Sequence, residues 1–442
     1  MGRDSFFSSR SYYDARPPRR KKKKKKDHKK AVLAFMKPFL LTLSGVVAMG
    51  VLALVAYRWI NAPVKSDSFR HFRLSYESIP EGADESLMEA AVEEIISENG
   101  RYADELADPE YMEENRVYAL EAADPEKVTF TFAGDILFDP NYSVMSTLRQ
   151  NGGSIDRGIA PEVINIMRNS DIMMINNEFP YSGRGTPLEG KQFTFRADPS
   201  DAAYLNDLGV DLVSLANNHA YDYGMQALVD TFDAIDSAGV EYVGAGMNDK
   251  EACKPIYYIV NNQKIAVLSA TQIEKGDSPD TRGAGTDTPG VFRCWKPDAL
   301  LEQIRTAKEN SDFVIVYIHW GTESQVETDW AQDEQAPMIA EAGADLIIGD
   351  HPHILQRLGT VRGTPIIYSL GNFWFNSKTQ DTCLVQVDIG QGGMAAFRFI
   401  PCVQSGCRTD LLHGEEKARV LQYMRSISPG VSIDEEGYVT FN

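Results

Sequence analysis

Cysteine and histidine are scarce in this chain of 442 residues, which contains 5 cysteines and 7 histidines. An odd number of cysteines cannot pair completely, and Cys253, Cys294 and Cys383 show no C-x-x-C spacing of the kind found in zinc or redox motifs. Cys402 and Cys407 are close enough in sequence for a local disulfide, but free buried thiols are an equal alternative. The cysteines therefore predict no chemistry.

Positive charge is in deficit as well, because Lys and Arg total 44 against 63 Asp and Glu, a formal net charge of −19. The deficit is uneven: residues 1–60 contain 15 Lys and Arg against three Asp, and so carry +12. This leaves −31 for residues 61–442. The basic run RPPRRKKKKKKDHKK is typical of a nucleic-acid-binding arm when it stands alone, but the sequence that follows it favours a different interpretation.

That following sequence, FLLTLSGVVAMGVLALVAY, is a run of 19 residues without a charge at positions 39–57. At 1.5 Å per residue in a helix, this is about the length that crosses a hydrocarbon core. A buried core helix is the alternative, but a segment that is apolar on every face fits a membrane better. We therefore predict a basic cytoplasmic tail at residues 1–37 and one transmembrane helix at residues 38–60.

The basic flank predicts the orientation of this anchor. Lysine and arginine hold the amino-terminal end in the cytoplasm, so everything after Tyr57 is expected outside the cell membrane. The segment lacks the short charged region and A-x-A-like site of a cleaved signal peptide, so we predict an uncleaved single-pass anchor. The lysines are expected to attract anionic lipid, and no nucleic-acid partner is predicted.

The composition and apolar pattern of the remaining chain change near residue 127. Residues 61–126 are acidic and poor in strand patterns, which indicates a stalk. Strand-length apolar runs then alternate with helical patterns, which predicts an α/β domain over residues 127–403, followed by a C-terminal extension at 404–442. The runs TCLVQVDIG and MAAFRFIPC have no helix between them and are expected to form an antiparallel hairpin around QGG.

Polar residues gather at the carboxyl ends of the predicted strands, where ligands bind in open α/β sheets. Taken singly, each has an ordinary explanation: Asp135 could cap a turn or helix, and His319 could be a satisfied core histidine. Their repetition is the signal, because four of the seven histidines occupy such ends. The residues are Asp135, Asn176, Asn177, Glu178, Asn217, Asn218, His219, His319, Glu323, Asp350, His351 and His353.

This mixture of oxygen and nitrogen donors predicts a metal site. It suits Mn²⁺, Fe or Zn²⁺ better than Ca²⁺ or Mg²⁺. One bridging carboxylate would allow two ions, and paired ions about 3.5 to 4 Å apart stabilise the attacking and leaving oxygens of a phosphoester. A purely structural polar cluster is the alternative.

With these residues assembled, the chain resembles the CapA family of poly-gamma-glutamate capsule biosynthesis proteins, whose domain is similar to the calcineurin-like metallophosphoesterases. The resemblance covers about residues 128–401 and implies a layered α/β/β/α sandwich. It rests on six segments in the family's order: FAGDILF, NNEFP, SLANNHAYDYG, YIHWGTE, GDHPH and YSLGNFWF.

The resemblance implies a role for each matching residue. Asp135 and His353 match ligands of a first metal, and Glu178 matches the carboxylate that bridges two metals. The matches to ligands of a second metal are Asn218, His319 and His351. His219 matches the histidine that protonates the leaving group, a role that needs reach more than ligation.

The chain also departs from the superfamily pattern. Leu137 stands where the first motif has a metal-binding histidine, so the first metal is one ligand short. Glu178 replaces an aspartate, and Ala220 replaces the acidic residue that orients the catalytic histidine. Asp222 is the candidate replacement for that acidic residue, because a neighbouring carboxylate can fix a histidine tautomer.

Three functions are compatible with the sequence. The resemblance implies an anchored component of capsule polymer synthesis or export, whose partners are an anionic polymer such as poly-gamma-glutamate and other capsule membrane subunits. The alternatives are an extracellular metal-dependent phosphoesterase or hydrolase and a non-catalytic adaptor stabilised by metal. Lys191 and Arg196 are candidates for a basic patch that attracts the polymer, although solvated surface charge is the more ordinary interpretation of both.

Overall fold

The computed structural model describes residue 97 and residues 99–273 and 281–442. The predicted tail, the predicted anchor and most of the predicted stalk lie outside these residues. Within the described part of the chain, no helix has both the length and the apolar character needed to cross a membrane.

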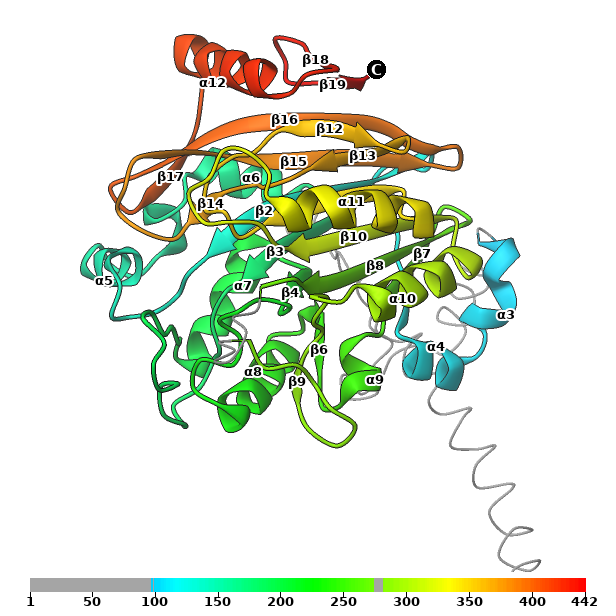
Figure 1. Ribbon diagram of the computed structural model, residues 1–442, viewed down its shortest axis with the longest axis horizontal. Coiled ribbons are helices and arrows are strands. Elements are labelled where there is room, and N and C mark those ends of the chain that lie inside the picture. The colour runs from blue at the N-terminus through cyan, green and yellow to red at the C-terminus, as the bar shows by residue number, and fades with distance from the viewer. Residues whose placement is uncertain (1–96, 98, 274–280) are drawn as a thin grey trace, which may run out of the picture.

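Two β-sheets form the centre of the molecule (Figure 1). The first contains, in spatial order, β1 (Val117–Ala119), β7 (Ile256–Val260), β8 (Gln263–Thr271), β10 (Phe313–His319), β11 (Leu346–Asp350), β13 (Thr364–Ile367) and β12 (Leu358–Val361). The second contains β17 (Arg408–Leu411), β16 (Gly393–Ser405), β15 (Gln380–Gly390), β2 (Lys127–Ile136), β3 (Ile172–Asn177), β4 (Leu212–Ser214) and β5 (Glu241–Val243), with β14 (Asn372–Trp374) beside β2.

Alternation along the strands produces the layers. In β2, Phe130 and Phe132 belong to the core between the two sheets, whereas Ala133 faces the helices on the other side. These helices are α5 (Ser143–Gln150), α6 (Pro161–Arg168), α7 (Ala203–Leu208) and α8 (Met225–Ser237). The first sheet is covered by α3 (Ala103–Leu106), α4 (Pro109–Asn115), α10 (Asp298–Glu309) and α11 (Trp330–Ala342). The predicted α/β class is confirmed, with helices outside two facing sheets.

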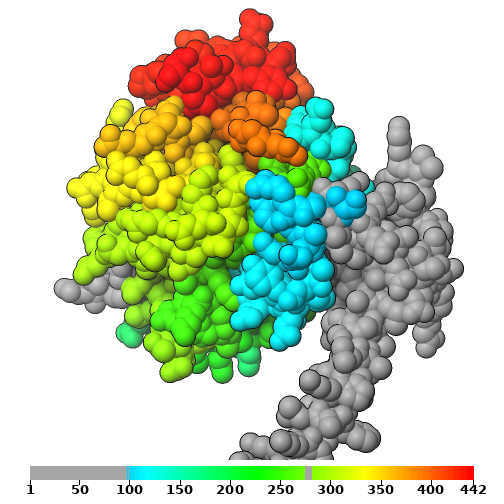
Figure 2. Space-filling model, turned by 90° about the vertical axis from the view of Figure 1, so that its right-hand side faces the viewer, coloured from blue at the N-terminus to red at the C-terminus, as the bar shows by residue number. Residues whose placement is uncertain are grey.

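Shorter elements complete the described fold. They are 3-10 helices η1 (Gly100–Tyr102), η2 (Ile155–Arg157) and η3 (Pro199–Ala202), strands β6 (Ala245–Gly246) and β9 (Gly290–Val291), and helix α9 (Asp249–Ala252). At the C-terminal end, α12 (Gly414–Ile427), β18 (Val431–Ile433) and β19 (Val439–Phe441) pack over β16 and form one end of the molecule, red in Figure 2.

The predicted hairpin is confirmed, since β15 and β16 pair antiparallel from Gln380 opposite Gln404 to Gly390 opposite Gly393. Strand β16 continues through the predicted domain boundary at residue 403, and β17 extends the same sheet. The proposed domain boundaries remain predictions.

Candidate metal centre

Strand register brings the polar strand ends together. In the second sheet, Asp135 of β2 lies beside Asn176 of β3 on one side and Asn372 of β14 on the other. In the first sheet, His319 of β10 lies beside Asp350 of β11. Because these neighbours run parallel, their carboxyl ends share one edge, and the two facing sheets place both sets of side chains in one buried cluster.

His319 is the centre of the first group of contacts. Its Nδ1 lies 2.9 Å from Asp350 Oδ1, and its Nε2 lies 2.8 Å from Asn218 Oδ1 and 3.0 Å from His351 Nδ1. Burial lowers the pKa of His319 to about 3, so the imidazole is neutral at physiological pH. Asp350 occupies the position of a carboxylate that orients a metal-binding imidazole.

Asp135 and His353 form a second group. Asp135 Oδ2 lies 2.9 Å from His353 Nδ1, and Asp135 Oδ1 accepts a hydrogen bond of 2.8 Å from the Asn176 amide. Burial opposes ionisation of Asp135, but the hydrogen bond and charge of His353, aided by His319 and Asn176, lower its pKa overall. Asn372 Oδ1 also lies 2.9 Å from His353 Nδ1.

Glu178 lies between these groups. It is fully buried, and neither of its carboxylate oxygens has a hydrogen-bond partner among the described residues. Its Oε1 is 3.7 Å from His319 Nε2 and 4.0 Å from His219 Nε2. Burial raises the pKa of Glu178 well above its ordinary value, and the charges of Asp135 and Asp350 raise it further.

The arrangement fits a bound cation. A buried carboxylate without a donor is costly, and a metal ion would satisfy it. Donor atoms about 2.0–2.2 Å from a tetrahedral ion are separated from one another by roughly 3.3–3.6 Å. The distances from His319 Nε2 to Asn218, His351 and Glu178, 2.8, 3.0 and 3.7 Å, bracket that separation.

Two sets of side chains each offer ligand atoms that all lie within 4.8 Å of one another: Glu178, His351 and His353, and Asp135, His319 and Asp350. With Asn218 beside His319, all six residues predicted as ligands are brought together. Asp350 was included among the polar strand ends but was given no individual role, and Asn372 was not singled out, although it lies within the quoted segment YSLGNFWF.

The backbone at the histidine pair is strained. His351 and His353 have φ values of 94° and 60°, a region that favours glycine. Such conformations cost roughly 1–3 kcal/mol each and persist where the surroundings enforce them, most often at functional sites. The Ser324 backbone N–H braces this turn by donating a 2.9 Å hydrogen bond to the Pro352 carbonyl.

His219 and Asp222, the predicted catalytic pair, are in contact. His219 Nδ1 lies 2.7 Å from Asp222 Oδ2, and both residues are buried. Burial lowers the pKa of His219, with the Asp222 charge opposing that effect. Leu137 and Ala220, which replace superfamily residues, are buried in the hydrophobic core beside α5 to α8.

Lys191 and Arg196 are less exposed than solvated surface charges would be. Lys191 is not a solvated surface charge: its side chain is 6% exposed, and its Nζ lies 2.5 Å from Asp222 Oδ1. The interpretation as ordinary surface charge was therefore wrong for Lys191, because a buried carboxylate attracts it inward. Arg196 is partly buried, with its guanidinium 4.4 Å from the centre of the Tyr223 ring.

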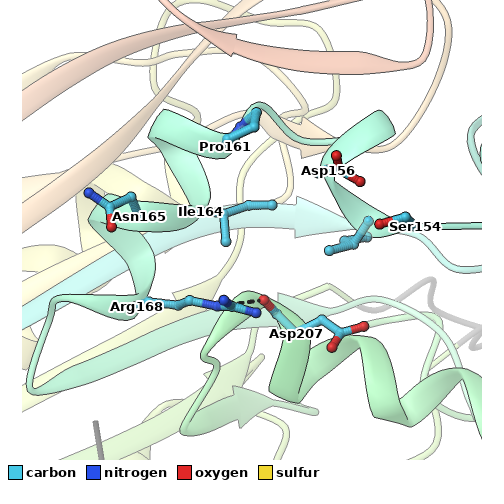
Figure 3. A pocket seen from close by; sticks show the side chains of 8 residues that line it. Ser154, Asp156, Pro161, Ile164, Asn165, Arg168 and Asp207 are labelled. Carbon is cyan, nitrogen blue, oxygen red and sulfur yellow. Dashed lines mark hydrogen bonds between the residues drawn. The ribbon is translucent and has the colours of Figure 1, made fainter. Parts of the chain in front are cut away.

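Two other features lie outside the centre. A cavity of about 310 Å³ next to α6 is lined by none of the predicted site residues (Figure 3), and the Arg168 guanidinium donates to the Asp207 carbonyl at its rim. All five cysteines are free thiols, including Cys402 and Cys407, so the alternative of a local disulfide is not the one observed.

Comparison with known proteins identifies the class. Residues 129–377 match the family described as "Bacterial capsule synthesis protein PGA_cap", more than half of the chain. The chain therefore belongs to this family, and the resemblance noted in the sequence is confirmed.

Its relatives include individual capsule proteins. The chain is 31% identical over 309 residues to the capsule biosynthesis protein CapA of Bacillus anthracis, covering 67% of this chain and 73% of that protein. It is 33% identical over 277 residues to the PGA biosynthesis protein CapA of Bacillus subtilis (strain 168), covering 61% and 70%. A solved structure, TT1561 of Thermus thermophilus, aligns with a TM-score of 0.33 and 9% identity, covering 60% of this chain and 95% of that one.

Proposed function

We propose that this chain takes part in the synthesis or export of a poly-gamma-glutamate type capsule, and that a metal centre in its α/β domain acts on the anionic polymer. Membership of the capsule synthesis family and the names of the two CapA relatives support the polymer assignment. The proposal includes the membrane anchor at residues 38–60 and association with other capsule membrane subunits.

One observation carries the metal centre: Glu178 is buried beside histidines with no hydrogen-bond partner for either oxygen among the described residues. Glu178 would be a ligand of a centre of one or two ions of Mn, Fe or Zn, and with two ions it would be the carboxylate that they share. Asp135 and His353 would hold one ion, and the second would bind Asn218, His319 and His351. Such ions, when bound, lower the pKa of water and neutralise developing negative charge.

Asn372 is the residue we propose to compensate for Leu137. Leu137 removes a ligand from the Asp135 side of the centre, and the Asn372 amide oxygen lies on that side, 2.9 Å from His353 Nδ1. An amide oxygen is a weaker ligand than imidazole, but it is accepted by the same hard and borderline ions.

The pair His219 and Asp222 favours chemistry over a purely structural centre. Asp222 holds His219 through Nδ1, so that Nε2 faces the buried Glu178 carboxylate at 4.0 Å. From there His219 can deliver a proton to a leaving group on a chain held at the centre. Because residues 61–442 carry −31, a polyanion is repelled from this domain except where cations reverse the field. The alternatives remain a phosphoesterase acting on another substrate and a non-catalytic adaptor.

The test separates ligand from proton donor in the purified full-length chain. His219→Ala should keep the bound metal and slow cleavage of poly-gamma-glutamate, or of a phosphodiester, by roughly 10²- to 10⁴-fold. Asn218→Ala should lower metal content and activity together. His413→Ala is the control, because His413 is 65% exposed and contacts Glu162 away from the centre.

Metal content is measured by mass spectrometry, polymer length by size-exclusion chromatography and phosphodiester cleavage by product absorbance. Wild-type activity in His219→Ala, combined with loss of both metal and function in Asn218→Ala, would assign the centre to binding or structure. An absence of cleavage in the wild-type chain with full metal content would favour the adaptor.

A further inference from the structure

A loop between β3 and η3 supplies contacts to the catalytic pair. Residues 182–196 contain neither helix nor strand, and the loop is closed at its base. Ser182 N–H donates to the Ala197 carbonyl at 3.0 Å, and Ala197 N–H donates to the Pro180 carbonyl at 2.9 Å. A loop whose ends are joined in this way is a compact unit, so its position on the domain depends on the contacts made by its interior residues.

Asp222 receives three of those contacts. The Leu188 backbone N–H donates to the Asp222 carbonyl at 2.8 Å, and the Phe195 backbone N–H donates to Asp222 Oδ2 at 2.7 Å. Lys191 Nζ donates to Asp222 Oδ1 at 2.5 Å and also to the Asn218 carbonyl. The same carboxylate that contacts His219 therefore accepts two hydrogen bonds from the loop.

The loop also contacts His219 directly. The Phe195 ring packs against the imidazole, with centroids 4.2 Å apart and planes inclined by 35°. This contact limits tilting of the ring but does not select which nitrogen carries the proton. That selection depends on the group that faces Nδ1, which is the Asp222 carboxylate at 2.7 Å.

The charge of Lys191 bears on that carboxylate. The Asp222 side chain is 0% exposed and that of Lys191 is 6% exposed, so the pair is shielded from water. Removing one partner of a buried ion pair leaves an uncompensated charge. Lys191 Nζ and the Phe195 N–H both donate to the Asp222 carboxylate, which therefore acts as the acceptor toward His219 Nδ1.

We propose that Lys191 is a positioning residue that acts through Asp222 to hold His219 as the Nδ1–H tautomer, with Nε2 directed at the metal centre. The importance of this tautomer for turnover rests on the proposed function, but the tautomer itself does not. In the Nδ1–H tautomer, Nε2 is free to take up a proton from solvent and pass it to the leaving group, and this transfer restores the same tautomer. Of the two basic residues singled out in the sequence, Lys191 thus supports His219 through Asp222. It is not a surface charge that attracts the polymer.

The test reads the tautomer without activity. The full-length chain is labelled with ¹⁵N at histidine and freed of metal with a chelator, and long-range ¹H–¹⁵N spectra report which ring nitrogen of His219 is protonated. Wild-type protein and Lys191→Arg should show the Nδ1–H form alone. Lys191→Met, which keeps the length of the side chain but removes its charge, should show a mixture or the Nε2–H form. Lys250→Met on the exposed face of α9 is the control.

Lys191→Gln replaces Lys191→Met if the latter does not fold, because the amide can still donate hydrogen bonds without carrying charge. An unchanged Nδ1–H form in the folded, uncharged variant overturns the proposal. With metal restored, the uncharged variant should keep its metal content and lose about 10- to 100-fold in turnover, the usual effect of removing a supporting contact. If the wild-type chain cleaves nothing, the proposed function fails, while the spectra still decide the role of Lys191.

Discussion

Glu178→Gln should have opposite effects on the metal-free and the metal-bound protein. The substitution keeps the shape of the side chain and removes its charge. In the metal-free protein, Glu178 is fully buried, its oxygens have no hydrogen-bond partner among the described residues, and Asp135 and Asp350 raise its pKa. The neutral amide should therefore stabilise the metal-free fold, although it removes a metal ligand.

The expected gain comes from removing the charge, because the amide is itself a buried polar group: above the ordinary pKa, each unit by which folding raises the pKa of the carboxyl costs about 1.4 kcal/mol. In a domain of this size, that corresponds to about 2 °C in Tm for each kcal/mol. Metal at 1,000 times its Kd should stabilise the wild-type protein by about 4 kcal/mol. In the variant, that increment should shrink by about 1.4 kcal/mol for each tenfold loss of affinity.

The stability of the metal-free protein should depend on pH in a defined direction. Because folding raises the pKa of Glu178, the folded metal-free protein binds more protons than the unfolded chain above about pH 4.5, the ordinary pKa. This contribution to stability is complete below that pH and is lost as the pH rises toward the folded pKa, with a slope of up to about 1.4 kcal/mol per unit. Glu178→Gln should flatten this part of the profile.

The assay is urea denaturation of both proteins with chelator and with metal, from pH 5 to pH 8. Glu334→Gln on the exposed side of α11 is the matched control and should change neither series. If Glu178→Gln is less stable than wild type in chelator, or responds equally to metal, Glu178 is satisfied within the folded protein and the argument for a bridging ligand is refuted.

Three further predictions concern the site, its backbone and its location. His351→Ala combined with His353→Ala should abolish stoichiometric metal by mass spectrometry, and full occupancy would contradict the assignment. Gly134→Ala should cost at least about 3 kcal/mol by denaturation and reduce metal binding, because a Cβ would lie 1.9 Å from the Gly371 carbonyl oxygen; Gly392→Ala, with no atom within 4 Å, is the control. Protease added to intact cells should digest the α/β domain but spare residues 1–37, and the reverse pattern would overturn the predicted topology.

The sequence predicted which polar residues lie at the carboxyl ends of the strands better than it predicted the contacts among them. Strand periodicity located the ends of β2, β10 and β11, and parallel pairing in each sheet brought their polar residues to one edge. The spacing of apolar residues alone could not show that Asn372 pairs beside Asp135, since β14 has only three residues. Nor could it show the left-handed backbone of His351 and His353.

Contacts between distant segments were the main omission. Lys191 lies in a loop without regular structure, so no pattern relates it to Asp222, and its charge suggested a surface position. A lysine is drawn inside only when a buried carboxylate compensates it, which is a property of the folded chain. Asp350 was visible as a strand end, but its contact with His319 depends on the register between β10 and β11.

There is a physical reason why the strand-end residues were predicted from the sequence and the contacts around His219 were not. Asp135, Glu178 and Asp350 are buried together, and burial, together with the charges of Asp135 and Asp350, raises the pKa of Glu178, so ionisation of all three carboxyl groups needs compensating positive charge. A fold retains such a cluster when cations bind it, because metal affinity then contributes to folding free energy. The proposed metal centre is therefore readable from composition at strand ends. The proposed proton transfer instead depends on the orientation of the single residue His219. In our proposal, that orientation depends on Asp222 and Lys191, at spacings that only the folded loop defines.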